Sequence, residues 1–98
     1  MAHSELQGIL DTVFATILDR QANPRPGSYT NHLLEAGEDE ILKKVGEEAM
    51  EVILAAKGQG DGRLIAEIAD LSYHLLVLLA ARGLSPADVG AELARRRR

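Results

Sequence analysis

Two pairs of acidic residues are spaced so that each pair would share one face of a helix. Glu48 and Glu51 are three positions apart, and so are Glu67 and Asp70. Residues at i and i+3 are neighbours on a helix surface. Four carboxylates brought into one cleft repel one another unless cations neutralise them. Because an all-oxygen ligand set favours a hard ion, we predict a Mg²⁺ site, with Mn²⁺ as an alternative.

Two lysines precede the first acidic pair by about one turn. Lys43 and Lys44 could hold a phosphate chain, and an ion of this kind can polarise a phosphoryl group and help to generate a hydroxide nucleophile. The same residues have an ordinary interpretation. Lys and Glu four apart, such as Lys44 and Glu48, commonly decorate helix surfaces and contribute about 0.2–0.5 kcal/mol per pair. From the spacing alone, a metal site and a solvated helix surface both stay open.

His74 follows Asp70 by four positions and extends the stripe formed by Glu67 and Asp70. One interpretation is a helix histidine that is hydrogen-bonded to Asp70. The other is metal ligation or proton transfer, which is less favoured because sites for hard cations prefer oxygen ligands. Tyr73 beside it is typical of a core residue.

Helical periodicity and turn residues predict the elements that position these side chains. We expect five helices, over 4–20, 28–36, about 38–57, about 61–82, and from Ser85 onward with Pro86 at its first position. Ser28 and either Asp61 or Gly62 are the expected caps of the second and fourth helices. No segment alternates with the period of a strand, so the predicted class is all-α, a small bundle of four to five helices. A short glycine-rich turn would make the third and fourth helices antiparallel and bring the acidic pairs face to face.

Composition narrows the class of protein. With 98 residues the chain reads as one domain over 1–98, and its net charge of −4 argues against a nucleic-acid binder. The absence of cysteine excludes disulfides and thiolate metal sites. No signal peptide is visible, and the apolar stretch 71–81 is too short to span a membrane, so we expect a cytoplasmic protein. The arginine run 95–98 is interpreted as a solvated tail.

The end of the fourth helix predicts a partner chain. From Leu75 to Ala81 the helix is apolar nearly all round, which is typical of a helix buried on every side. A chain of this size has little material to cover it, so we predict a homodimer.

At the acidic pairs the sequence resembles a known group of enzymes. Glu48-x-x-Glu51 followed by Glu67-x-x-Asp70 is similar to the ExxE…ExxD signature of the MazG-like, all-α nucleotide pyrophosphohydrolases. The flanking stretches sharpen the resemblance to the phosphoribosyl-ATP pyrophosphohydrolase family, and it covers nearly the whole chain. These stretches are 28–30, 41–49 and 69–75.

The resemblance implies Mg²⁺-dependent attack of water on the triphosphate of 1-(5-phosphoribosyl)-ATP, in the second step of histidine biosynthesis. The metal acids would be Glu48, Glu51, Glu67 and Asp70, and Glu47 would orient or activate the water together with Glu48. Lys43 and Lys44 would face the phosphates. Ser28, Tyr29 and His74 are further candidates for substrate binding.

Two alternatives remain. One is a MazG-like enzyme that cleaves free nucleoside or deoxynucleoside triphosphates with the same acids and a different base and sugar pocket. The other is a non-catalytic helical dimerisation module whose acids are merely solvated.

Overall fold

Five α-helices make up the chain in the computed structural model, which describes residues 2–97 and the side chains of residues 5–97. The helices are α1 Ala2–Ala22, α2 Tyr29–Ala36, α3 Glu38–Gly58, α4 Asp61–Ala81 and α5 Pro86–Arg96. No strand occurs between residues 2 and 97, so the predicted all-α class is confirmed. The predicted helix ends lie within two residues of the observed ones, because helix boundaries follow from local capping and glycine signals.

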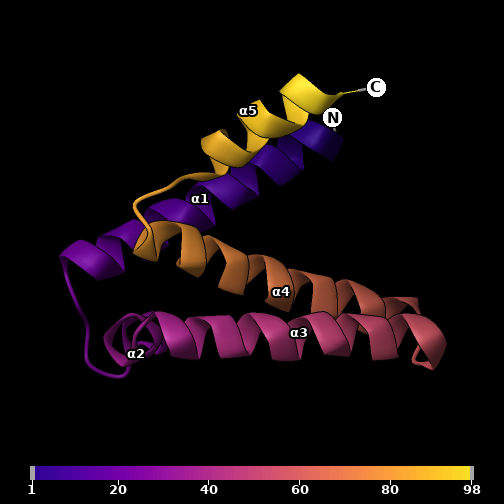
Figure 1. Ribbon diagram of the computed structural model, residues 1–98, viewed down its shortest axis with the longest axis horizontal. Coiled ribbons are helices and arrows are strands. Elements are labelled where there is room, and N and C mark those ends of the chain that lie inside the picture. Colours follow the sequence, from indigo (N-terminus) through magenta and orange to yellow (C-terminus); the bar gives the residue numbers. More distant parts are fainter. Residues whose placement is uncertain (1, 98) are drawn as a thin grey trace.

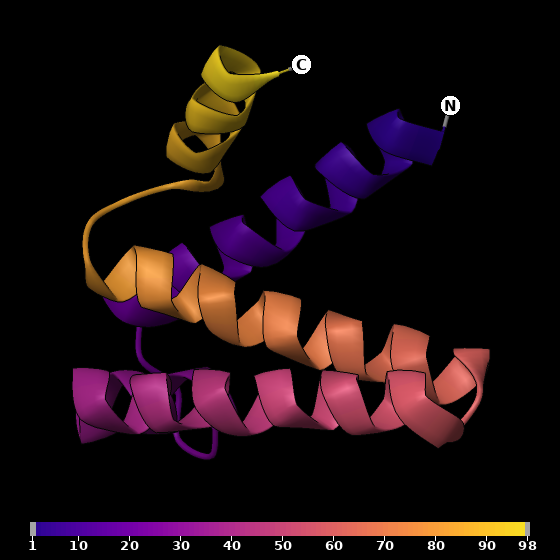
Figure 2. The ribbon, with the colours of Figure 1, turned by 45° about the vertical axis from the view of Figure 1, so that its right-hand side comes forward.

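Helices α3 and α4 are the framework of the molecule. They lie side by side and antiparallel in both ribbon views, and their contact is the most extensive between two helices in the described chain (Figures 1 and 2). Helix α1 crosses α4 near the C-terminal end of α4. Helix α2 packs against α3 at the same end of the hairpin. Helix α5 contacts α1 and buries none of its side chains. The antiparallel hairpin is therefore the element that brings the two acidic pairs together.

Local signals explain where the helices begin. The Ser28 side chain accepts a hydrogen bond of 3.2 Å from the backbone N–H of Asn31, which confirms Ser28 as the cap of α2. Before α5, the Ser85 backbone N–H donates to Asp88 Oδ2 over 2.9 Å. The cap of α4 is Gly60, so the expectation of Asp61 or Gly62 is wrong by one or two positions. At φ 85° Gly60 adopts the left-handed region that glycine enters without steric cost, which makes the tight α3–α4 turn possible.

The hydrophobic core lies at one end of the hairpin, where four helices meet. It is mainly aliphatic and draws on α1, α2, the start of α3 and the second half of α4; its members are Phe14, Ile17, Leu33, Ile41, Leu76, Val77 and Ala80. The other end of the hairpin extends beyond this core. The chemistry expected on α3 and α4 therefore sits on a stiff hairpin that is anchored at one end.

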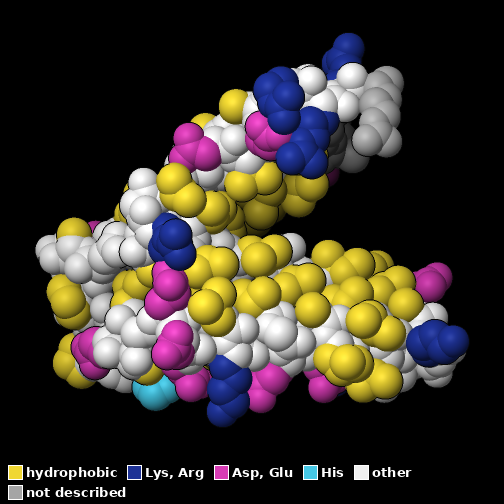
Figure 3. All heavy atoms as spheres, in the orientation of Figure 1, with side chains coloured by type: hydrophobic (Ala, Val, Ile, Leu, Met, Phe, Trp, Pro, Cys, Tyr) yellow, Lys and Arg dark blue, Asp and Glu magenta, His cyan; other side chains and the backbone are white. Residues whose placement is uncertain are grey.

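Much apolar surface stays exposed in the single chain. Leu76, Val77 and Ala80 are buried, but Leu75 on the same helix is 40% exposed, so the chain alone does not bury this stretch on every side. Hydrophobic side chains cover the face of α3 and α4 that lies below α1 and α5 (Figure 3). An apolar groove of about 530 Å³ runs between α1, α4 and α5. Its lining is Leu10, Ser72, Leu75, Leu76, Leu78, Leu79, Pro86, Val89, Gly90 and Leu93.

Helix α4 is longer than the apolar stretch expected from the sequence. It has 21 residues, and its mean hydropathy of 1.7 makes it long and apolar enough to cross a membrane by length and composition. Core helices of globular proteins have the same properties. In the single chain 28% of the apolar window of α4 is buried, and the helix carries the buried polar residues Glu67 and His74, of which His74 is hydrogen-bonded to Tyr29 on α2.

Candidate active site

The acidic residues line a polar cleft of about 520 Å³ between the side chains of α3 and α4. We call it the acid cleft. Its lining combines acidic side chains with two cationic ones and one methionine: Lys44, Glu47, Glu48, Met50, Glu51, Arg63, Glu67 and Asp70. All four acids of the predicted metal site are present. The antiparallel hairpin thus produces the face-to-face arrangement predicted from the spacing.

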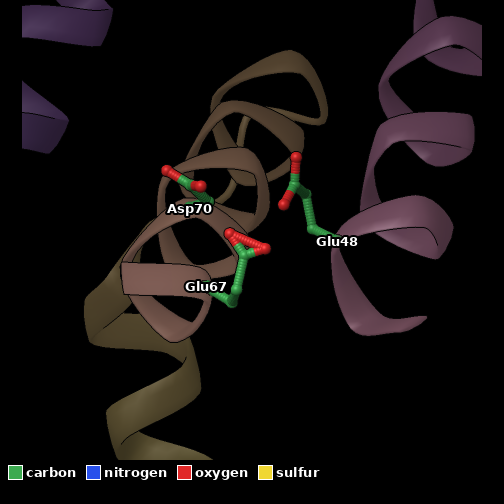
Figure 4. Close-up of side chains that lie close together, drawn as sticks. All are labelled: Glu48, Glu67 and Asp70. Carbon is green, nitrogen blue, oxygen red and sulfur yellow. The ribbon is translucent and has the colours of Figure 1, made fainter. Parts of the chain in front are cut away.

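Three of these carboxylates converge. Glu48 projects from α3 toward Glu67 and Asp70 on α4, and each offers an oxygen within 4.8 Å of the others (Figure 4). Glu51 lines the same cleft but lies outside this group of three. Glu51 follows Glu48 by about one turn of α3, and of these two acids Glu48 is the one whose carboxylate lies close to both acids of α4. We call Glu48, Glu67 and Asp70 the acid triad.

The acid triad combines buried and accessible carboxylates. Glu67 is only 4% exposed, Glu48 is half-buried and Asp70 is exposed. Burial raises the pKa of the Glu67 carboxyl, the charge of Arg63 opposes this rise, and Asp70, Glu48 and Glu51 add to it. A bound divalent cation would offset the cost of burying the charged Glu67 carboxylate and would reduce its repulsion by the neighbouring carboxylates. A set of carboxylate oxygens that opens to solvent fits a hard cation that keeps some of its water ligands.

The two lysines have different surroundings. Lys44 lines the acid cleft, and its ammonium lies 3.4 Å from a carboxylate oxygen of Glu47. This hydrogen bond raises the pKa of Lys44. Lys44 therefore pairs with Glu47 at i+3 and not with Glu48 at i+4, which leaves Glu48 directed toward α4. Lys43 is exposed on α3 and lies outside the lining of the cleft.

A buried hydrogen-bond network fixes His74 next to the acid cleft. His74 is 5% exposed, and its Nδ1 lies 2.8 Å from the backbone carbonyl oxygen of Asp70. Because a carbonyl only accepts, Nδ1 carries a proton and donates. In the neutral imidazole Nε2 is then an acceptor, and the Tyr29 hydroxyl donates to it over 2.9 Å. The hydrogen-bonded interpretation of His74 fits this geometry, with the backbone of Asp70 as the acceptor.

Tyr29 places an aromatic ring beside the charged groups. Its ring is 46% exposed, and its centroid lies 6.2 Å from that of Tyr73 and 5.7 Å from that of His74. Burial raises the pKa of the Tyr29 hydroxyl, and the nearby charge of Lys44 opposes that rise. Tyr29 therefore contacts His74 and lies near enough to Lys44, in the cleft lining, for that charge to act on its hydroxyl. Ser28 is half-buried and is used as the cap of α2.

Comparison with known proteins identifies the family. The profile of the family described as Phosphoribosyl-ATP pyrophosphohydrolase matches residues 10–97. The chain belongs to the phosphoribosyl-ATP pyrophosphohydrolase family. This match includes the whole acid cleft, Tyr29 and His74, so the resemblance read from the acidic motif and its flanks is confirmed.

Two relatives named phosphoribosyl-ATP pyrophosphatase match over nearly their full length, and a bifunctional relative matches over part of its length. A phosphoribosyl-ATP pyrophosphatase of Pelotomaculum thermopropionicum is 58% identical over 89 residues, which are 91% of each chain. One of Sulfurisphaera tokodaii is 54% identical over 88 residues, 90% of this chain and 94% of the relative. A histidine biosynthesis bifunctional protein of Thermoanaerobacter pseudethanolicus is 52% identical over 84 residues, 86% of this chain and 39% of the relative.

Two residues of this phosphoribosyl-ATP pyrophosphohydrolase family member were missed by the sequence analysis. Arg63 lines the acid cleft one turn before Glu67, and extending the Glu67–Asp70–His74 stripe backward by four residues would have found it. Asn31 is buried; its Oδ1 accepts from the backbone N–H of Arg25, and its Nδ2 donates to the carbonyl of Arg20. These bonds fasten the loop before α2 to the end of α1. No local pattern signals this role, because the partners lie 6 and 11 residues away.

Proposed function

We propose that this protein hydrolyses 1-(5-phosphoribosyl)-ATP to 1-(5-phosphoribosyl)-AMP and pyrophosphate, the second step of histidine biosynthesis. The reaction adds water across the anhydride between the α- and β-phosphates. The observation that carries the proposal is the acid triad, a carboxylate set suited to a cation, in a chain that belongs to the phosphoribosyl-ATP pyrophosphohydrolase family. Full-length identity of 58% to a relative named for this activity supports the choice of substrate.

The acid triad is the proposed Mg²⁺ site, with Mn²⁺ as a substitute. Glu48, Glu67 and Asp70 would ligate directly, and Glu51 is placed in the same cleft to ligate a second ion or a metal-bound water. When bound, the cation polarises the phosphoryl group under attack and lowers the pKa of water. Glu67 contributes a buried carboxyl group, so little water would compete with the cation for its oxygens.

The remaining cleft residues are proposed to orient the substrate and the attacking water. Glu47 lines the cleft next to Glu48, and its carboxylate is held by Lys44, which suits a group that positions water. Lys44 is the better-placed phosphate ligand of the two lysines, since Lys43 lies outside the cleft lining. Tyr29 offers the exposed part of its ring as a wall of the substrate site, because its hydroxyl already donates to His74.

We further propose that the protein is a homodimer. Large apolar side chains are at least 40% exposed along α1, α3, α4 and α5, which includes Ile9, Ile53, Leu75 and Leu93. Contiguous apolar surface of this extent is typical of an interface between subunits. Helix α5 buries none of its side chains in the single chain, so a partner is the natural cover for the apolar groove. A cytoplasmic location fits the proposed biosynthetic role.

The test is pyrophosphate release with Mg²⁺ from phosphoribosyl-ATP, compared with ATP and a panel of deoxynucleoside triphosphates. We expect turnover of phosphoribosyl-ATP at a kcat/KM at least about 100-fold above that of the other nucleotides, because an enzyme that hydrogen-bonds the phosphoribosyl group would discriminate strongly against nucleotides that lack it. Turnover of the free triphosphates instead would keep the chemistry and overturn the substrate. No release from any of them, together with no Mn²⁺ binding, would support the non-catalytic dimerisation module.

A further inference from the structure

Arg63 occupies the first turn of α4 and lines the acid cleft with a side chain that is 57% exposed. Its Nη2 lies 3.9 Å from Glu67 Oε2. This distance is within reach of an ion pair and too long for a hydrogen bond. The guanidinium therefore faces the most buried carboxylate of the acid triad by charge alone, and its N–H donors are not used on that carboxylate.

The charges that line the cleft indicate what a bound cation would do to this contact. The lining contains the carboxylates of Glu47, Glu48, Glu51, Glu67 and Asp70 against two cationic side chains, one on each helix. Lys44 on α3 is paired with Glu47, and Arg63 on α4 faces Glu67. A divalent cation on the acid triad would take over the neutralisation of Glu67. Arg63 would then be a cation next to another cation, and its exposed side chain is free to turn toward an anion.

We propose that Arg63 exchanges Glu67 for a phosphate group of the substrate when a divalent cation binds to the acid triad. This inference rests on the proposed function, because it assigns Arg63 to the triphosphate of the same substrate. The planar guanidinium presents paired donors that match two oxygens of a phosphate, which an ammonium cannot do. Arg63 on α4 and Lys44 on α3 both line the cleft, so both would be available to the phosphate chain.

The exchange predicts effects of opposite sign for the variant R63Q. Without substrate, loss of the cation beside Glu67 leaves the acid triad more negative, so Mn²⁺ should bind roughly two- to fivefold more tightly. With substrate, loss of a charge-assisted phosphate contact should raise the KM about tenfold or more and change the kcat little. Arg and Gln have similar helix propensity, so α4 should keep its structure.

Two further variants separate charge from geometry. R63K keeps the charge but not the paired donors, so its Mn²⁺ affinity should match that of the unmodified protein while its KM rises. R82Q is the matched control, because Arg82 pairs with Glu38 over 3.2 Å on the exposed surface and lies outside the cleft lining. R82Q removes the same charge and should change neither quantity. Mn²⁺ affinity is measured by electron paramagnetic resonance, and KM by pyrophosphate release with saturating Mg²⁺.

The possible results distinguish a failure of the Arg63 exchange from a failure of the proposed hydrolase function. An unchanged KM in R63Q, beside normal turnover by the unmodified protein, overturns the phosphate contact and leaves the enzyme activity intact. Unchanged or weaker Mn²⁺ binding in R63Q overturns the exchange, since Arg63 would then not compete with the cation. If the unmodified protein turns over none of the nucleotides tested, the proposed function fails, and the proposal fails with it. Tighter Mn²⁺ binding combined with a raised KM supports the exchange.

Discussion

The two halves of α4 face different surroundings. In the first half, Arg63, Glu67 and Asp70 line the acid cleft and meet only α3 across it. In the second half, Leu76 and Val77 are buried in the core that α1 and α2 complete. The difference shows that one helix can carry the candidate site in one half and contribute to the hydrophobic core with the other half. The half that would admit the proposed triphosphate substrate is covered less, and the half that anchors the hairpin is covered by other helices of the chain.

The largest effect is expected from a substitution in the acid triad, in the first half of α4 and the facing part of α3. We expect Glu48→Gln to lower the kcat/KM by more than about 100-fold, because even partners that only support a metal ligand are worth 10–100-fold. The side chain contributes charge and not packing, so circular dichroism and the midpoint of thermal unfolding should stay unchanged. Activity within tenfold of the unmodified protein, with metal present, would remove Glu48 from the site.

A substitution in the apolar groove tests whether a second copy of the chain covers the surface beside the second half of α4. Leu93 is 65% exposed on α5 and lines the groove, so Leu93→Asp should cost the single chain little. If a second copy covers this surface, the charge should weaken dimerisation by at least about tenfold, since it replaces an apolar contact worth about 1.5–3 kcal/mol. Sedimentation velocity over a range of concentrations measures this effect. Thr16→Asp, on an exposed part of α1 outside the groove, is the control. Equal sedimentation of both variants and the unmodified protein would refute this interface.

His74 lies where the two halves of α4 meet. The substitution Tyr29→Phe tests how much its hydrogen bond to Tyr29 contributes to stability. The change removes the hydroxyl that donates to Nε2 and leaves a buried ring nitrogen without that partner. We expect a loss of about 1 kcal/mol in the free energy of unfolding, measured by urea titration. Glu35→Gln, at an exposed position of the same helix, serves as the control. A stability equal to that of the unmodified protein would show that the bond adds nothing.

The smallest expected effect is on the pH dependence of stability, and it comes from the buried Glu67 in the first half of α4. Burial raises the pKa of Glu67 above its ordinary value of 4.5, so the folded protein holds this proton more tightly than the unfolded chain does. The stabilising contribution is present at low pH and lost as the pH rises through the raised pKa. In chelator, Glu67→Gln should therefore unfold at a higher temperature than the unmodified protein, and the difference should grow between about pH 4 and about pH 7. A difference that does not change with pH would contradict the raised pKa.

Local rules explain how much of the fold was predictable from the sequence. Helix periodicity and caps such as Ser28 and Pro86 act within one or two turns, so the five helices were predicted with small errors at their ends. The i, i+3 spacing likewise placed Glu67 and Asp70 on one face. What sequence patterns could not predict is which residue of one helix is level with which residue of another. That depends on how α3 and α4 pack along their length.

The helical class, the antiparallel hairpin and the two acidic pairs could be inferred from the residues alone, because each follows from short-range geometry and from the glycine-rich turn. Packing between helices was needed to show that Glu48 belongs to the acid triad while Glu51 lies outside it, and that Arg63 lines the cleft while Lys43 does not. It also decided that Tyr29 donates to His74, 45 residues away. These are contacts between elements, and they depend on packing across the whole chain, which the spacing within one helix does not record.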